Sequence, residues 1–82
     1  MRYGPFQIVF TLDTDRHRII RKIVLAVELV FRENPKYYVT PWSTYPSILV
    51  PTPTEEVDLY ATQKEAENAY YDRLGCDCTT IE

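Results

Sequence analysis

Residues 14–34 read TDRHRIIRKIVLAVELVFREN, and the conformation of this stretch decides the fold. Its isoleucines and valines are β-branched and suit a strand. The signals at its ends favour a helix, because Asp13 or Thr14 can cap an N-terminus and Asn34-Pro35 is a typical C-terminal stop. At about 100° per residue, the charged and the apolar side chains also separate onto opposite arcs. The pattern therefore predicts a first helix over residues 14–34.

The segments around this stretch predict several strands. Apolar and polar residues alternate over residues 6–12, and Val9 on the second face indicates a central strand that is covered on both sides. Five of the six prolines lie between residues 35 and 53, so strands in that region are expected at a sheet edge. From short apolar runs and renewed alternation, the remaining strands are predicted over residues 36–40, 47–50, 57–61 and 76–81.

A second helix is predicted from local signals alone. Thr62-x-x-Glu65 is a capping box, and Gly75 follows the final turn as a C-terminal cap. The resulting order, β-α-β-β-(β)-α-β, matches the ferredoxin-like α+β architecture, in which two helices lie on one face of a small antiparallel sheet. A chain of 82 residues is expected to form a single domain over residues 1–82. Many unrelated functions share this architecture.

The composition is that of a folded protein, with 45% apolar and 26% charged residues. The richest apolar run is interrupted by charges, and residues 1–5 lack the apolar region of a signal peptide. We therefore expect a cytoplasmic protein that enters no membrane and keeps its cysteines reduced. The net charge of −3 divides into +3 over residues 1–36 and −6 over residues 37–82. This division predicts either attraction between the two halves or a dipolar surface that steers a charged partner.

Groups that could carry chemistry are few. His17 is the one histidine, and no serine or cysteine motif provides a nucleophile for it to activate. Cys76 and Cys78 lack the further Cys and His ligands of a structural zinc site, and we expect two small buried apolar residues on the last strand. A redox or metal role of these cysteines stays open. We predict no enzyme, no catalytic residue, no metal and no cofactor.

An RNA-binding or small-molecule-binding ferredoxin-like module is the alternative interpretation. Arg16, Arg18, Arg21 and Lys22 with nearby aromatic residues could supply phosphate and stacking contacts. The negative net charge and the absence of a basic-Gly-aromatic run argue against RNA, so nucleic acid is not the expected partner. A small enzyme is the third interpretation.

Two features favour a protein-binding surface. On the predicted first helix, Leu25 and Leu29 lie four residues apart inside the charged arc, as an apolar patch rimmed by arginines. The second feature is the aromatic and proline-rich segment of residues 35–46, because Tyr and Trp supply many interface anchors. The rings of this segment could equally fill the core of a small domain.

We therefore predict a non-enzymatic protein-interaction domain, an adaptor or inhibitor of a larger complex. Its partner is a protein of unknown identity, and a homodimer through the first helix is possible because one patch then serves both copies. The predicted partner-binding residues are Leu25, Leu29, Arg18, Arg21, Arg32, Tyr37, Tyr38, Trp42 and Tyr45.

Overall fold

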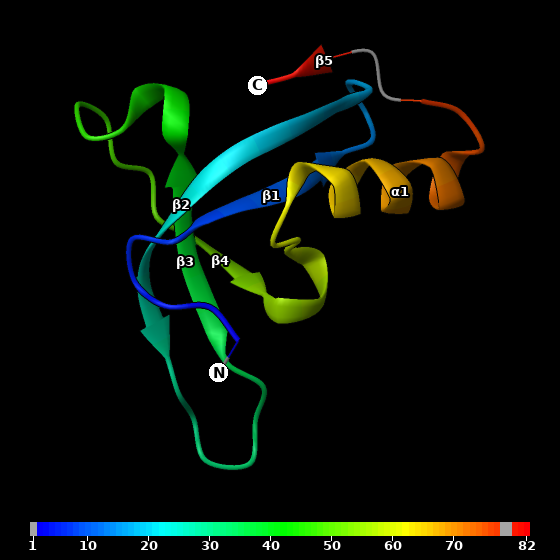
Figure 1. Ribbon diagram of the computed structural model, residues 1–82. Coiled ribbons are helices and arrows are strands. Elements are labelled where there is room, and N and C mark those ends of the chain that lie inside the picture. The colour runs from blue at the N-terminus through cyan, green and yellow to red at the C-terminus, as the bar shows by residue number, and fades with distance from the viewer. Residues whose placement is uncertain (1, 78–79) are drawn as a thin grey trace.

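In the computed structural model, which describes residues 2–77 and 80–82, four antiparallel strands form a meander that curls into a half-barrel (Figure 1). The sheet order is β1-β2-β3-β4, and a short β5 runs parallel to the start of β2. One α-helix follows the meander and lies beside β1 and β2. The elements are β1 (Ile8–Asp13), β2 (Arg18–Glu28), β3 (Lys36–Pro41), the 3-10 helix η1 (Trp42–Thr44), β4 (Thr52–Glu55), the 3-10 helix η2 (Glu56–Asp58), α1 (Gln63–Leu74) and β5 (Thr80–Ile81).

The prediction of a helix over residues 14–34 is wrong. Residues 18–28 form β2, which pairs with β1 and with β3. Asp13, the expected helix cap, instead accepts a hydrogen bond from Arg18 Nε at 2.8 Å across the β1–β2 turn. The ferredoxin-like order and the pair of helices on one face are therefore also wrong, because α1 is the one α-helix among the described residues.

A bulge in β2 explains why the sequence resembled a helix. Ile19 and Ile23 alternate with residues on the other face, but the register shifts between Val24 and Ala26. As a result Val24 and Val27, three residues apart, lie on one face of the sheet opposite Val39 and Tyr37, a spacing that is also typical of a helix face. Because β2 pairs with a strand on each side, its β-branched residues pack against neighbouring strands. This packing stabilises the strand more than the capping and stop signals at residues 13–14 and 34–35 stabilise a helix.

The other predicted strands have mixed outcomes. The strands at residues 6–12 and 36–40 are confirmed as β1 and β3, and Val9 and Phe10 are both buried, one on each face of β1. β1 is an edge strand of the meander rather than a central one, and β2 and β3 are its interior strands. Residues 47–50 form a loop, and residues 57–61 contain the end of η2 and one β-bridge. Cys76 is exposed, contrary to the prediction, and Cys78 lies outside the described residues.

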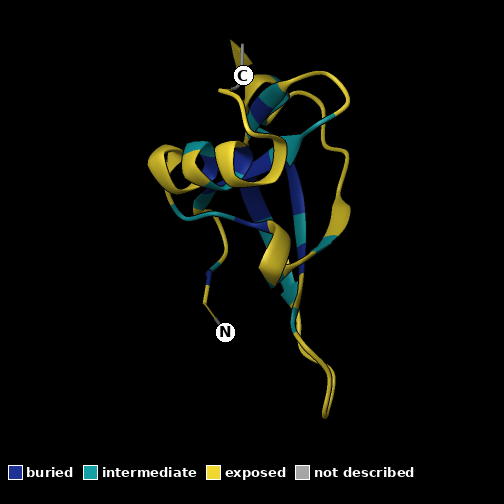
Figure 2. Cartoon of the chain, turned by 90° about the vertical axis from the view of Figure 1, so that its right-hand side faces the viewer, coloured by how far each residue is buried: buried dark blue, intermediate teal, exposed yellow. Residues whose placement is uncertain are grey.

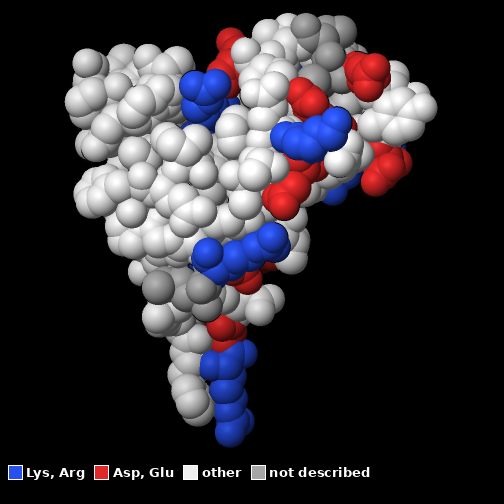
Figure 3. Space-filling model, in the orientation of Figure 1, with Lys and Arg blue, Asp and Glu red and all other residues white. Residues whose placement is uncertain are grey.

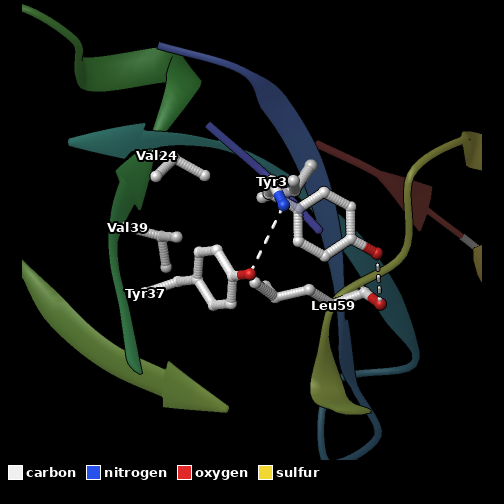
Figure 4. Close-up of a cluster of buried hydrophobic side chains, with 6 residues drawn as sticks. Tyr3, Val24, Tyr37, Val39 and Leu59 are labelled. Carbon is white, nitrogen blue, oxygen red and sulfur yellow. Dashed lines mark hydrogen bonds between the residues drawn. The ribbon is translucent and has the colours of Figure 1, made fainter. Parts of the chain in front are cut away.

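One β-bridge returns the chain to its first strand and gives the half-barrel its curl. The Phe10 N–H donates to the Tyr60 carbonyl at 2.9 Å, and the Tyr60 N–H donates to the Phe10 carbonyl at 3.0 Å. Side chains on the two faces of the sheet form two core clusters. One contains Tyr3, Val9, Val24, Tyr37, Val39 and Leu59 (Figure 4), and the other contains Phe10, Ile19 and Ala66 of α1.

Two buried tyrosines connect distant parts of the chain inside the first cluster (Figure 4). The Tyr37 hydroxyl accepts from the backbone N–H groups of Arg2 at 2.9 Å and Tyr3 at 3.3 Å. It donates to Glu56 Oε1 at 2.9 Å. The Tyr3 hydroxyl donates to the Leu59 carbonyl at 3.2 Å, and burial raises the pKa of Tyr3. The N-terminal segment, β3 and η2 are therefore held together by hydrogen bonds within the core.

The sequence prediction for the C-terminal helix is confirmed. The Thr62 hydroxyl accepts from the Glu65 N–H at 3.2 Å, and Glu65 Oε2 accepts from the Ala61 N–H at 3.1 Å. Gly75 has a φ of 72°, and its N–H donates to the Tyr71 carbonyl at 2.7 Å. The outer face of α1 is exposed (Figure 2), while Ala66 and Tyr70 are buried against the sheet side.

Replacing Thr62 by alanine should lower the free energy of unfolding by about 0.5–2 kcal/mol, because the N–H of Glu65 loses its acceptor. Urea denaturation of the two proteins measures the difference. Gln63→Ala, one position along in the same exposed first turn, is the control and should change the free energy by less than about 0.5 kcal/mol. Equal midpoints for Thr62→Ala and the wild type would contradict the capping role.

Candidate functional site

The structure divides the predicted aromatic surface into core and exposed parts. Tyr37 is fully buried and belongs to the core, so it is not available to a partner. Tyr38 is half-buried, and its hydroxyl donates to Glu28 at 3.4 Å. Trp42 and Tyr45 stack on each other outside the core, with ring centroids 5.6 Å apart and an interplanar angle of 19°. Among the four aromatic residues predicted to bind a partner, Trp42 and Tyr45 are therefore the two that the structure brings together near the surface.

The predicted leucine patch does not form. Since residues 18–28 are a strand, Leu25 and Leu29 are not neighbours on a helix face. Leu25 is half-buried at the bulge of β2, and Leu29 lies beyond the end of the strand with 67% of its surface exposed. The apolar patch on helix one, and the homodimer built on it, are therefore corrected together with that helix.

The predicted arginines are spread along β2 and its hairpin. Arg18 forms ion pairs with Asp13 and Glu82, at the end of β2 beside β5. Arg21 is exposed within β2, and Arg32 lies in the β2–β3 loop, with its guanidinium carbon 5.2 Å from the Phe31 ring centroid. These three side chains do not gather at one site. Figures 1 and 2 show that the hairpin that carries Arg32 projects away from the rest of the molecule.

A surface that the sequence analysis missed lies between β3 and β4. We call residues 42–51, which follow β3 and include η1, the apolar loop. Ile48, Leu49 and Val50 are consecutive and all exposed. No charged residue occurs between Tyr37 and Thr54, and in Figure 3 the corresponding part of the molecule, at the upper left, is white except at its margin. The absence of charged residues in this run is the feature of the sequence that could have indicated the surface.

Hydrogen bonds within the apolar loop hold its backbone in place. The Tyr45 N–H donates to the Trp42 carbonyl at 3.2 Å, and the Ile48 N–H donates to the Thr44 carbonyl at 2.8 Å. The Val50 N–H donates to the Thr40 hydroxyl of β3 at 3.1 Å. The loop therefore presents its apolar side chains from a backbone that is already ordered.

A second feature that the sequence analysis missed is a cavity of about 370 Å³ that extends from β1 and β2 to β4, η2 and α1. Lys22 of β2 and Arg73 of α1 are among its lining residues. Burial lowers the pKa of Lys22, and the nearby Arg18 acts in the same direction, whereas Asp13 opposes the shift. Lys22 is partly buried because it lies in β2, an interior strand of the sheet.

The remaining candidate groups do not form a metal site among the described residues. His17 lies in the β1–β2 turn, with Nδ1 2.9 Å from the Tyr70 hydroxyl. No group of three or more His, Cys, Asp or Glu side chains within residues 2–77 and 80–82 is arranged to hold a metal ion. In the same residues, no helix is both long and apolar enough to span a membrane.

Comparisons with known protein families, with curated proteins and with solved structures found no match. The geometry of the described residues is therefore the basis for functional inference.

Proposed function

We infer that this protein is a non-enzymatic protein-interaction domain whose contact surface is the apolar loop. The observation that carries this proposal is the exposure of Ile48, Leu49 and Val50 in an uncharged run of sequence. Contiguous exposed apolar side chains are unfavourable in water, and they mark interaction sites more often than scattered ones do. The internal hydrogen bonds of the loop support the same interpretation, since an ordered backbone reduces the entropy lost on binding.

The partner that best fits this surface is a second copy of the chain. A surface with no charges from Tyr38 to Thr54 meets its own copy without like-charge repulsion. In a two-fold dimer the same patch serves on both sides, so each copy covers the apolar residues of the other. The arginines that were predicted to rim the leucine patch lie on β2 and its hairpin, outside the apolar loop.

The neighbouring strand β4 favours contact through side chains rather than through a continued sheet. β4 pairs with β3 on one side, and Pro53 within it has no N–H to donate to a further strand. Pro51 precedes it and has the same limitation. Prolines at an exposed edge discourage strand addition. The expected dimer therefore packs Trp42 and residues 48–50 of one copy against the same residues of the other.

Replacing Val50 by aspartate should weaken self-association at least about tenfold, since one lost apolar contact of about 1.5–3 kcal/mol corresponds to that factor or more. Val57→Asp is the matched control, because Val57 is 72% exposed in η2 while Val50 is 55% exposed in the apolar loop. Sedimentation equilibrium over a range of concentrations measures the dissociation constants of the wild type and both variants.

We expect similar dissociation constants for the wild type and Val57→Asp, and a dissociation constant at least about tenfold higher for Val50→Asp. Circular dichroism checks that all three are folded. A wild type that stays monomeric at millimolar concentration, or a dimer that Val50→Asp leaves unchanged, would overturn self-association through this loop. A monomer that binds a different protein through the same residues would assign the loop to another partner and reject the second copy.

A further inference from the structure

The edge of β2 that faces away from β3 is covered along only part of its length. β1 pairs with residues 18–23 on this edge, and Val24 exchanges backbone hydrogen bonds with the segment just before β1. Beyond Val24, none of the described strands pairs with this side of β2. Residues 25–30, which read Leu-Ala-Val-Glu-Leu-Val, therefore extend into the projecting hairpin with one edge open (Figures 1 and 2).

The alternation of bonds in an antiparallel sheet shows which backbone groups face this open edge. Val24 bonds toward β1, so its neighbour Ile23 bonds toward β3, where it pairs with Thr40. Every second residue of β3, counted back from Thr40, then bonds to β2, and the residues opposite these positions are Ala26 and Glu28. The backbone groups of Ala26 and Glu28 are therefore used within the β2–β3 pair.

Val27 lies between these two residues, so its N–H and C=O groups point to the open edge. Leu29 lies just beyond β2 with 67% of its surface exposed. Among the described residues, no loop or turn bonds to the backbone of either residue. The outer edges of the meander are protected, by Pro51 and Pro53 at β4 and by the bridge to Tyr60 at β1. The edge at Val27 lacks such protection, and a further strand can add there.

The complement of such an edge is an extended strand, and the same residues of a second copy match it. With a two-fold axis at Val27, two antiparallel copies exchange both backbone hydrogen bonds between their Val27 residues. Each Leu25 then lies opposite a Leu29, and each Ala26 lies opposite a Glu28. No like charges meet in this register, whereas an axis at Glu28 would place the two carboxylates opposite each other. Apolar pairing and charge both favour the axis at Val27.

We propose that the open edge of β2 pairs with the same edge of a second copy, antiparallel and centred on Val27, so that the two sheets become continuous. This surface is separate from the apolar loop. β3 begins at Lys36, opposite Glu28, and the apolar loop follows its other end at Pro41. The pairing therefore does not depend on the proposed function. Because it consists of one short strand pair, it belongs to the class of small and weak interfaces.

Quenched amide hydrogen exchange of the full chain, measured by NMR, tests this pairing residue by residue. Val50→Asp is used as the background, so that the apolar loop does not contribute. The Val27 amide should exchange at least about threefold more slowly at millimolar than at micromolar protein concentration, because it gains an acceptor only in the pair. The Ala26 and Glu28 amides already bond within the sheet and should change less. Exchange at Val27 that is independent of concentration would overturn the proposal.

Two substitutions at Ala26 test the register. Ala26 is exposed, and in the proposed pair it faces Glu28 of the second copy. In the same background, Ala26→Lys should lower the dissociation constant and Ala26→Glu should raise it, with about tenfold or more between them. Gln63→Lys and Gln63→Glu make the same changes of net charge at an exposed position of α1 and should differ by less than about twofold. Sedimentation equilibrium measures all four variants. Equal dissociation constants for the two Ala26 variants reject the pairing.

Discussion

Replacement of Tyr37 by alanine is expected to lower the free energy of unfolding by about 3–5 kcal/mol, the usual cost of removing a large buried aromatic side chain. Tyr37 is fully buried at the centre of the first core cluster, and its ring lies 5.4 Å from that of Tyr3 in an edge-on arrangement. Since small domains have a total stability of about 5–15 kcal/mol, this change removes a large share of it and should lower the midpoints of thermal and urea unfolding. Thermal and urea denaturation measure the effect.

Two phenylalanine variants separate the hydroxyl group from the ring. Tyr37→Phe leaves two backbone N–H groups and Glu56 without their shared partner and should cost about 1–3 kcal/mol. Tyr38→Phe is the matched control, because the Tyr38 hydroxyl has one long and exposed contact at 3.4 Å, and it should cost less than about 0.5 kcal/mol. Similar losses for the two variants would contradict the central position of Tyr37 in the core.

The second large effect is expected at Ile19, in the interior strand β2. Ile19 is fully buried and packs with Phe10 and Ala66, so Ile19→Ala should lower the free energy of unfolding by about 2–5 kcal/mol. Leu29→Ala, just beyond the same strand, removes an exposed side chain and should change it by less than about 0.5 kcal/mol. Urea denaturation of both variants measures the contrast.

A large loss of stability in Leu29→Ala would show that Leu29 is packed, contrary to its exposure in the structure. Far-UV circular dichroism provides an independent check. One α-helix of 12 residues should give a spectrum dominated by β-structure, whereas the helix predicted over residues 14–34 would roughly triple the helical signal.

The parts of the fold that could be predicted from the sequence are those specified by local chemistry. Thr62, Glu65 and Gly75 satisfy the backbone groups at the ends of α1 within a few residues, so their pattern is sufficient. β2 depends on partners elsewhere in the chain and on a bulge at Leu25 that changes the phase of its side chains. In a strand every second side chain faces the same way, and a bulge that shifts this alternation can imitate the 3.6-residue period of a helix over a short stretch. This similarity led to the wrong fold class.

The candidate site was harder to predict because it also depends on contacts between segments that are far apart in the chain. The exposure of Ile48, Leu49 and Val50 follows from a loop conformation that the short apolar run does not indicate, since such runs more often form buried strands. The cavity joins Lys22 to Arg73 and Asp58, which are about 50 and 35 residues further along the chain. Only the curl of the sheet brings these side chains to one place, and the sequence contains no local signal for it.

The bridge between Phe10 and Tyr60 has a consequence for the order of folding. The β1–β2 and β2–β3 hairpins join neighbouring segments, so their loops close at little entropic cost. The bridge joins residues 50 positions apart and is made by two hydrogen bonds only. We therefore expect the meander to assemble first and the closing segment, with α1, to dock late. Until it docks, Phe10 and Ile19 lack the cover of Ala66, and a chain still emerging from the ribosome would expose this face to other proteins.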